Sequence, residues 1–206
     1  MRNVRHSHIL LAAISIFSIA FGQAASAQFG TGPKPAPPMR KAADLIHRQD
    51  PAKINKALES VINPDNSHVV ISITKQRAYL MTGDQIYIDS PISSGNNRTG
   101  HYTPTGHFHV QEKDPNHHSS LYGNFVDGGG RVVRAGVSAN ADSAPSGTHF
   151  AGAPMKWFCR ITEGVGMHVG ILPGYPASHG CVRLPDQIAP LIYQRVRVGT
   201  RVEIEP

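Results

Sequence analysis

Apolar and polar side chains alternate along much of the chain after residue 67, and this period of two is typical of β-strands. Short polar or glycine-containing turns at residues 75–76 and 82–84 separate the first three runs, as in a meander of antiparallel strands. The pattern predicts a mostly β domain, either a sandwich or an open barrel. The expected strands cover residues 68–74, 77–81, 85–93, 107–113, 131–137, 156–162, 164–169 and 201–205.

Two segments have apolar residues at helical spacing. Asp50 and Pro51 are suited to begin a helix, and Asn63-Pro64 is suited to end it after residues 54, 57, 58, 61 and 62. We therefore expect residues 40–66 to form a helical N-terminal extension. A second, shorter helix is expected within residues 185–196, begun by Asp186.

The first 27 residues have the pattern of a secretory signal peptide. Arg2 and Arg5 precede an apolar run over 9–21, and small residues at 25–27 resemble a cleavage site before Gln28. The run is shorter than the roughly 20 residues of a membrane-spanning helix. Residues 28–39 are rich in proline and glycine and predict an extended tether. We expect an exported protein without stable membrane insertion, although an uncleaved N-terminal anchor is the alternative.

Removal of residues 1–27, which contain two arginines and no acidic residue, would leave 179 residues and lower the formal charge from +6 to +4. A chain of that length can bury an ordinary core as one domain. The positive charge is compatible with an anionic polymer such as a cell wall. It is too diffuse for nucleic acid, because no cluster of Lys and Arg is interleaved with aromatic residues.

The chain has two cysteines, Cys159 and Cys181. A disulfide between them is one possibility in an exported protein. Their surroundings favour separate roles, however. Cys159 lies between aromatic residues in a strand-like run and suits a small buried side chain, whereas Cys181 lies among polar and glycine residues.

The stretch "GMHVGILPGYPASHGCVRLP", residues 166–185, carries the candidate chemistry. A catalytic thiolate needs a base within reach and hydrogen-bond donors for the developing oxyanion. His168 on a strand is the candidate base, and the amides of Gly180 and Cys181 are candidate donors. A metal site is an alternative because the chain has 12 histidines, including His107 with His109 and the adjacent pair His117 and His118, but neither an HExxH nor a CxxC motif is present. A surface loop without catalytic function is the remaining alternative from these residues alone.

Three ordered motifs resemble the L,D-transpeptidase catalytic domain, a family of bacterial cysteine enzymes of peptidoglycan cross-linking. They are "ISITKQRAYLMTGDQIYIDSPISSG", "TPTGHF" at residues 103–108, and "SHGCVR" at 178–183 with His168 upstream. The resemblance covers residues 68–205 and implies a catalytic domain over 67–206. The expected fold is thus a β-sandwich or open barrel of the L,D-transpeptidase type, with one helix before it and a short helix near the C-terminus.

The resemblance implies that Cys181 is the nucleophile and His168 the general base, with the carbonyl of Val169 orienting that histidine. It also implies that a larger group shapes the oxyanion site and holds the substrate, namely Ser178, His179, Gly180 and Arg183. Arg183 stands where some family members carry asparagine.

The implied reaction is acyl transfer on peptidoglycan stem peptides through a thioester, with release of D-alanine, and it needs no metal or organic cofactor. The acyl acceptor is left open: a diamino acid on a second stem, water, a free D-amino acid or the lysine of another protein. A catalytically silent wall-binding module is the alternative of a different class. The expected location is the periplasm or cell wall, and we expect a monomer.

Overall fold

The computed structural model describes residues 49–206, all within one compact unit that spans Met39–Pro206. The predicted signal peptide, the tether and the first part of the predicted helical extension lie outside the described residues. None of the helices in the described part is long and apolar enough to cross a membrane.

The larger sheet has six strands in the order β1-β4-β3-β2-β13-β5. The predicted meander forms its centre, because β2, β3 and β4 pair antiparallel in sequence. The last strand of the chain, β13, pairs parallel with β2, so the C-terminus completes the middle of the sheet. The strands are β1 (Lys53–Ile54), β2 (Ser67–Ser72), β3 (Arg77–Thr82), β4 (Gln85–Pro91), β5 (Gly106–His109) and β13 (Arg201–Glu205).

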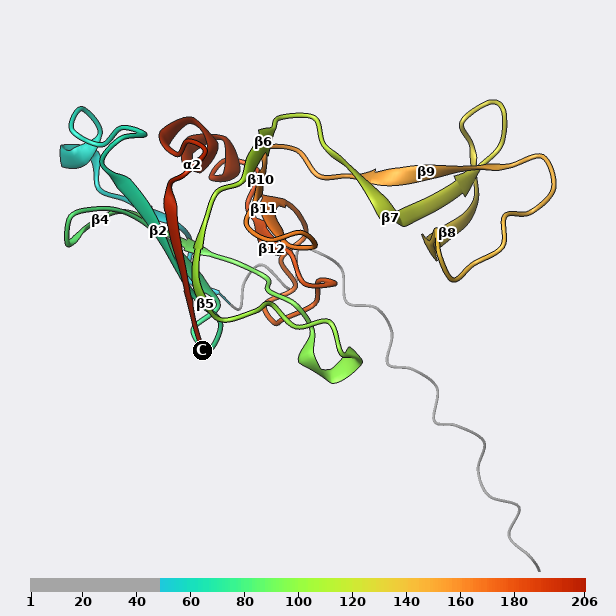
Figure 1. The fold of residues 1–206 in the computed structure, drawn as a ribbon, viewed down its shortest axis with the longest axis horizontal. Coiled ribbons are helices and arrows are strands. Elements are labelled where there is room, and N and C mark those ends of the chain that lie inside the picture. Colours follow the sequence, from blue (N-terminus) through green and yellow to red (C-terminus); the bar gives the residue numbers. More distant parts are fainter. Residues whose placement is uncertain (1–48) are drawn as a thin grey trace, which may run out of the picture. The chain divides into compact units, whose positions relative to one another are not determined.

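A second sheet of four strands has the order β12-β11-β10-β6. Strands β10 and β11 pair antiparallel, and β11 pairs parallel with β12. Figure 1 shows these strands beside the larger sheet, with helix α2 (Ala189–Arg195) at one end of the two. The strands are β6 (Glu112–Asp114), β10 (Phe158–Arg160), β11 (Gly166–Val169) and β12 (Val182–Leu184).

The core lies between the two sheets and α2. Alternate residues of the strands point inward from both sheets. Burial of each such Leu, Ile or Val side chain stabilises the fold by roughly 1.5–3 kcal/mol. The most completely buried of these include Ile71, Leu80, Ile88, Ile161, Leu184, Ile192 and Ile204. The mostly β fold with a short helix near the C-terminus is therefore confirmed.

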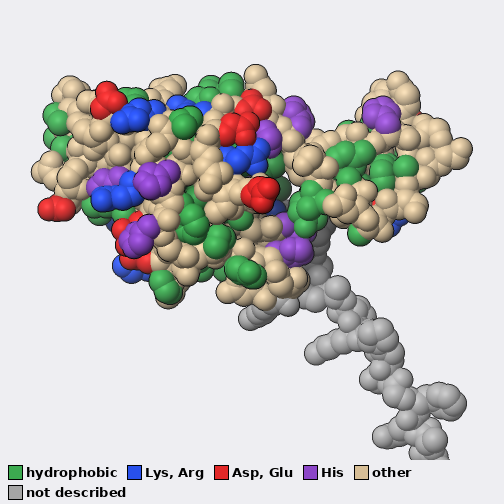
Figure 2. Space-filling model, in the orientation of Figure 1, with side chains coloured by type: hydrophobic (Ala, Val, Ile, Leu, Met, Phe, Trp, Pro, Cys, Tyr) green, Lys and Arg blue, Asp and Glu red, His purple; other side chains and the backbone are tan. Residues whose placement is uncertain are grey.

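A third sheet, in the order β8-β7-β9, was predicted only in part. Its strands follow β6 and precede β10 in the sequence: they are β7 (His118–Val126), β8 (Val132–Ser138) and β9 (His149–Pro154). Figure 2 shows hydrophobic side chains exposed over this sheet, and Val132 and Val133 of β8 are each about half exposed. Of its strands, only β8 was expected from the sequence.

The prediction of a helix after Pro51 is wrong. Lys53 and Ile54 pair with β4 as strand β1, and a single 3-10 turn, η1 (Lys56–Leu58), follows. The N–H of Asn55 donates to the Tyr87 carbonyl, and the side chain of Asn55 accepts from Ala57, so hydrogen bonding to the sheet replaces a helix. Leu58 and Ile62 are buried as the spacing predicted, but the turn is too short to form a helix.

Candidate active site

The four-stranded sheet turns one face to the core and the other to a cavity. Successive strand residues point to opposite faces, so Cys159, Met167 and Val182, which share one register, all point into the core. The positions next to them point the other way. The cavity-facing side chains are Phe158, Arg160, His168, Cys181 and Arg183, all of which line the cavity.

The predicted nucleophile loop, residues 170–181, is held by the segment that follows β4. The N–H of Ser178 donates to the Ser94 carbonyl at 3.0 Å, and the N–H of Asn96 donates to the Ser178 carbonyl at 3.0 Å. Beyond the loop, Ser93 and Arg183 exchange two backbone hydrogen bonds of 3.1 and 3.0 Å. The backbone on both sides of Cys181 is therefore fixed to a neighbouring segment.

Thr103 completes this support from a buried position. Its hydroxyl donates to the carbonyl of Gly180 at 2.7 Å and accepts the N–H of Gly95 at 2.8 Å. Thr103 belongs to the "TPTGHF" motif, to which sequence reasoning gave no role. Its hydroxyl holds the residue immediately before Cys181.

Ser178 shapes the turn from inside the loop. Its hydroxyl donates to the Cys181 carbonyl and accepts the N–H of Gly180 at 3.1 Å. The Gly180 amide is therefore occupied, and the expectation that it donates to a substrate oxyanion is not met here. None of the loop and turn hydrogen bonds in the described residues uses the Cys181 N–H. Gly180 has φ +118°, a conformation that favours glycine.

His168 is buried and oriented by a backbone carbonyl. Its Nδ1 lies 2.7 Å from the carbonyl oxygen of Val169, and a proton on Nδ1 leaves Nε2 as the basic nitrogen. Burial lowers the pKa of His168 to about 4, against the opposing effect of the Val169 hydrogen bond and with a further lowering by Arg183. At neutral pH the imidazole is therefore uncharged.

The Cys181 thiol lies at the edge of the same face. Its Sγ accepts the N–H of Gly166 at 3.5 Å and donates to the Gly164 carbonyl at 3.9 Å. Burial raises the pKa of the thiol, opposed by the Gly166 hydrogen bond and the positive charge of Arg183. Among the described residues no hydrogen bond joins Cys181 to His168, although both line one cavity.

His179 belongs to an aromatic cluster rather than pointing at the thiol. Its ring stacks on Tyr122 of β7 with 4.0 Å between centroids, and His101 meets it edge-on at 4.6 Å. Burial, then His101 and Arg183, lower the pKa of His179. The cluster joins the nucleophile loop to β7, which sequence reasoning had not found.

The side chain of Arg183 packs against Gly170, the first residue of the nucleophile loop. An added Cβ at Gly170 would lie 2.7 Å from Cγ of Arg183, so only glycine there admits the arginine stem. Burial lowers the pKa of Arg183, and the nearby Cys181 opposes the shift. The guanidinium is the candidate to meet an anionic group in the cavity.

The cavity has a volume of about 1350 Å³ and extends to both sides of Cys181. One side is lined by the start of β7 and the end of β9. There, the pairing of β7 with β9 shifts register between His118 and Gly123, and the Ser119 hydroxyl accepts the N–H groups of Leu121 and Tyr122. The other side is lined by residues 169–172, 185–187 and, unexpectedly, 49–52.

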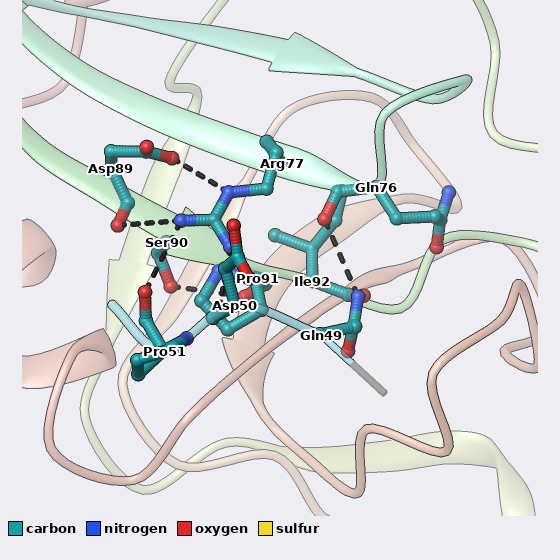
Figure 3. A network of polar contacts seen from close by, with 9 residues as sticks. All are labelled: Gln49, Asp50, Pro51, Gln76, Arg77, Asp89, Ser90, Pro91 and Ile92. Atoms are coloured by element: carbon teal, nitrogen blue, oxygen red, sulfur yellow. Dashed lines mark hydrogen bonds and ion pairs between the residues drawn. The ribbon is translucent and has the colours of Figure 1, made fainter. Parts of the chain in front are cut away.

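Residues 49–52 are attached to the sheet by a network centred on Arg77 (Figure 3). The Arg77 guanidinium pairs with Asp89 at 2.6 Å and donates to the Asp50 carbonyl at 2.7 Å. The amide of Gln49 donates to the carbonyl of Ile92 at 2.9 Å. Sequence reasoning had assigned this segment to a helix without a part in the site.

Cys159 is free and fully buried, and so is not joined to Cys181. Burial raises the pKa of its thiol to about 12. Because the two cysteines point to opposite faces of the sheet, a disulfide would require the strands to move. The prediction of a small buried side chain at Cys159 is confirmed.

Residues 49–206 contain no group of three or more His, Cys, Asp or Glu side chains placed to hold a metal ion. His107 and His109 share a face of β5, as the alternation predicted, and both are exposed. Nδ1 of His107 lies 4.0 Å from a carboxylate oxygen of Glu203. No other ion pair among the described residues involves His107.

The comparisons with known proteins agree with this geometry. The family model YkuD, described as the L,D-transpeptidase catalytic domain, matches residues 66–204, which is more than half of the chain. No protein of curated function matches the sequence.

Solved structures share the fold. An L,D-transpeptidase from Mycobacterium smegmatis is similar with a TM-score of 0.50 at 18% identity, over 68% of this chain and 59% of that one. An L,D-transpeptidase from Stackebrandtia nassauensis has a TM-score of 0.50 at 16% identity, over 82% of this chain and 68% of that one. The chain thus spans about three-fifths of the mycobacterial protein.

Proposed function

Because the chain belongs to the L,D-transpeptidase catalytic domain family, we propose that it is a cysteine-dependent L,D-transpeptidase that acts on peptidoglycan stem peptides. One observation carries the proposal: Cys181 and His168 line one cavity from the same sheet face, and the Val169 carbonyl orients the imidazole. The cavity is large enough for a peptide, since ligand pockets typically measure roughly 300–1,000 Å³.

In the first step, Nε2 of His168 accepts the thiol proton while Sγ of Cys181 attacks the carbonyl that precedes the terminal D-alanine. The shifted pKa values leave the resting pair as a neutral thiol and a neutral imidazole, so proton transfer accompanies attack. The protonated imidazole, with a pKa near 4, is then a strong acid for the departing D-alanine amine. The C–N bond breaks and a thioester remains.

The oxyanion of each tetrahedral intermediate needs a fixed donor. The Cys181 N–H is our candidate, because the Gly180 N–H is already bonded to Ser178. Ser178 and Thr103 would then act through the loop by holding the backbone around this donor. His179 and Arg183 would position the substrate.

In the second step, an amine of a diamino acid on a neighbouring stem attacks the thioester and forms the cross-link. Attack by water would make the enzyme an L,D-carboxypeptidase, and attack by a D-amino acid or a protein lysine would make it an exchange or anchoring enzyme. We expect the cross-linking reaction to take place in the periplasm or cell wall, by a monomer and without a cofactor.

The test is incubation of the protein with disaccharide-tetrapeptide fragments, followed by mass spectrometry of the products. We expect free D-alanine and cross-linked dimers with the wild type and neither with Cys181→Ala. Tripeptide without dimer would indicate the carboxypeptidase, and incorporation of an added D-amino acid would indicate exchange. Absence of D-alanine release under all these conditions would refute the proposal in favour of a silent wall-binding module.

A further inference from the structure

Besides His168 and His179, His117 also lines the cavity, and it is oriented by a carboxylate. Nδ1 of His117 lies 3.2 Å from Oδ2 of Asp114, the last residue of β6. The His117 ring stacks on Phe158 with 4.1 Å between centroids and an interplanar angle of 12°. Its side chain is 21% exposed and lines the cavity, whereas that of Asp114 is 38% exposed and is not among the lining residues.

This pair lies beside His168 on the cavity face of the four-stranded sheet. Asp114 pairs with Phe158, and the register of β10 and β11 brings Phe158 opposite His168. The rings of Phe158 and His168 are 6.3 Å apart. The charge of a protonated His117 also lowers the pKa of His168, so the two imidazoles are close enough to interact.

A carboxylate at Nδ1 gives His117 the arrangement of a general base. The hydrogen bond to Asp114 holds the proton on Nδ1 and fixes the ring, which leaves the Nε2 lone pair available. In the described residues, Nε2 of His117 has no hydrogen-bond partner. Sequence reasoning considered His117 only with His118, as a possible metal pair.

Attack on the thioester by the acceptor amine requires a base, and His168 is poorly suited to be that base. The acceptor amine of a stem peptide is an ammonium at neutral pH and must lose a proton before it can attack. His168 has its pKa lowered to about 4 by burial and so has little affinity for that proton. His179 is engaged by two aromatic rings.

We propose that His117, oriented by Asp114, is the general base that deprotonates the acceptor amine. This inference rests on the proposed function. Nε2 of His117 takes one proton from the ammonium, and the neutral amine attacks the thioester carbon. The C–S bond then breaks as the amide forms, the sulfur takes a second proton from the attacking nitrogen through His168, and His117 releases its proton to water.

The experiment compares His117→Gln with the matched control His118→Gln. His118 is the neighbouring histidine and is exposed. In the described residues its side chain hydrogen-bonds to the Asn116 carbonyl and is not among those that line the cavity. Each full-length variant is assayed for the rate of covalent adduct formation with a carbapenem, for stem-peptide cross-linking, and for thioester resolution by hydroxylamine. Hydroxylamine is already unprotonated at neutral pH and needs no base.

For His117→Gln we expect adduct formation within about twofold of wild type, cross-linking lower by about 10²-fold, and unchanged resolution by hydroxylamine. Asp114→Asn should show the same pattern with a smaller loss, and His118→Gln should match wild type throughout. Normal adduct formation also shows that the variant is folded.

Three results would overturn the inference. They are equal losses with hydroxylamine and with the stem acceptor, a matching loss in adduct formation, and undiminished cross-linking in His117→Gln. Wild-type protein that forms the adduct but no cross-link would also refute it, since no amine acceptor would then be used. Wild-type protein that forms no adduct would instead refute the proposed function.

Discussion

Replacement of Thr103 by valine tests whether the buried hydroxyl holds the nucleophile loop. Valine has nearly the same shape as threonine but cannot hydrogen-bond, so the Gly180 carbonyl and the Gly95 N–H would both lose their partner. Leaving a buried polar group unsatisfied costs roughly 1–3 kcal/mol, so with two such groups we expect the free energy of unfolding to fall by about 2–6 kcal/mol.

The same change should slow acylation, because the Gly180 carbonyl precedes Cys181 directly. The measurements are urea unfolding and the rate of carbapenem adduct formation, each beside Thr105→Val. Thr105 is exposed two residues away and has no hydrogen bond in the described set, so its variant should resemble wild type. Equal stability and equal acylation of the two variants would refute the role assigned to Thr103.

Three further changes have defined outcomes. Because the pKa of His168 is lower in the folded state than the usual 6.5, the unfolded chain binds more protons between pH 6.5 and 4. The free energy of unfolding should therefore fall by up to about 3 kcal/mol as the pH is lowered from about 6.5 to about 4. Urea unfolding of His168→Gln should lack this dependence on pH. A thiol reagent at neutral pH should label one cysteine of the native protein and none in Cys181→Ala, since Cys159 is buried with a pKa of about 12; labelling of Cys159 would contradict its placement. Gly166→Ala would put a Cβ 2.3 Å from the ring of Phe158, and overpacking of this kind should cost about 1–3 kcal/mol in urea unfolding.

Much of the sheet structure could be predicted because alternation of apolar and polar residues is a local property. Strands β4 and β13 lie within predicted runs, β2 and β3 each extend one residue beyond theirs, and α2 lies within its predicted segment. Strands β7 and β9 were missed because "HSSLYGNFV" and "HFAGAP" are rich in small and polar residues and carry no regular apolar face.

The error at residues 51–62 has a different cause. The helical spacing there is real, and it does bury Leu58 and Ile62, but pairing of Lys53 and Ile54 with β4 gives the backbone stronger partners than one isolated helix would. Local sequence does not contain that pairing, because β4 begins 31 residues after β1 ends.

The site shows the same division. The motif around Cys181 identified the nucleophile candidate, its histidine and the Val169 carbonyl. Thr103, Tyr122 and residues 49–52 reach the site through contacts between segments far apart in sequence, so spacing alone did not reveal their roles. His117 was visible only as half of a histidine pair until the structure placed Asp114 beside it.

The most direct test of the central claim is the intact mass of the protein after incubation with a carbapenem, whose strained carbonyl can acylate a thiol. We predict one covalent adduct on reduced wild-type protein and on Cys159→Ala, and none on Cys181→Ala. An unmodified wild type, or an adduct that persists in Cys181→Ala, would contradict the assignment of Cys181 as the nucleophile.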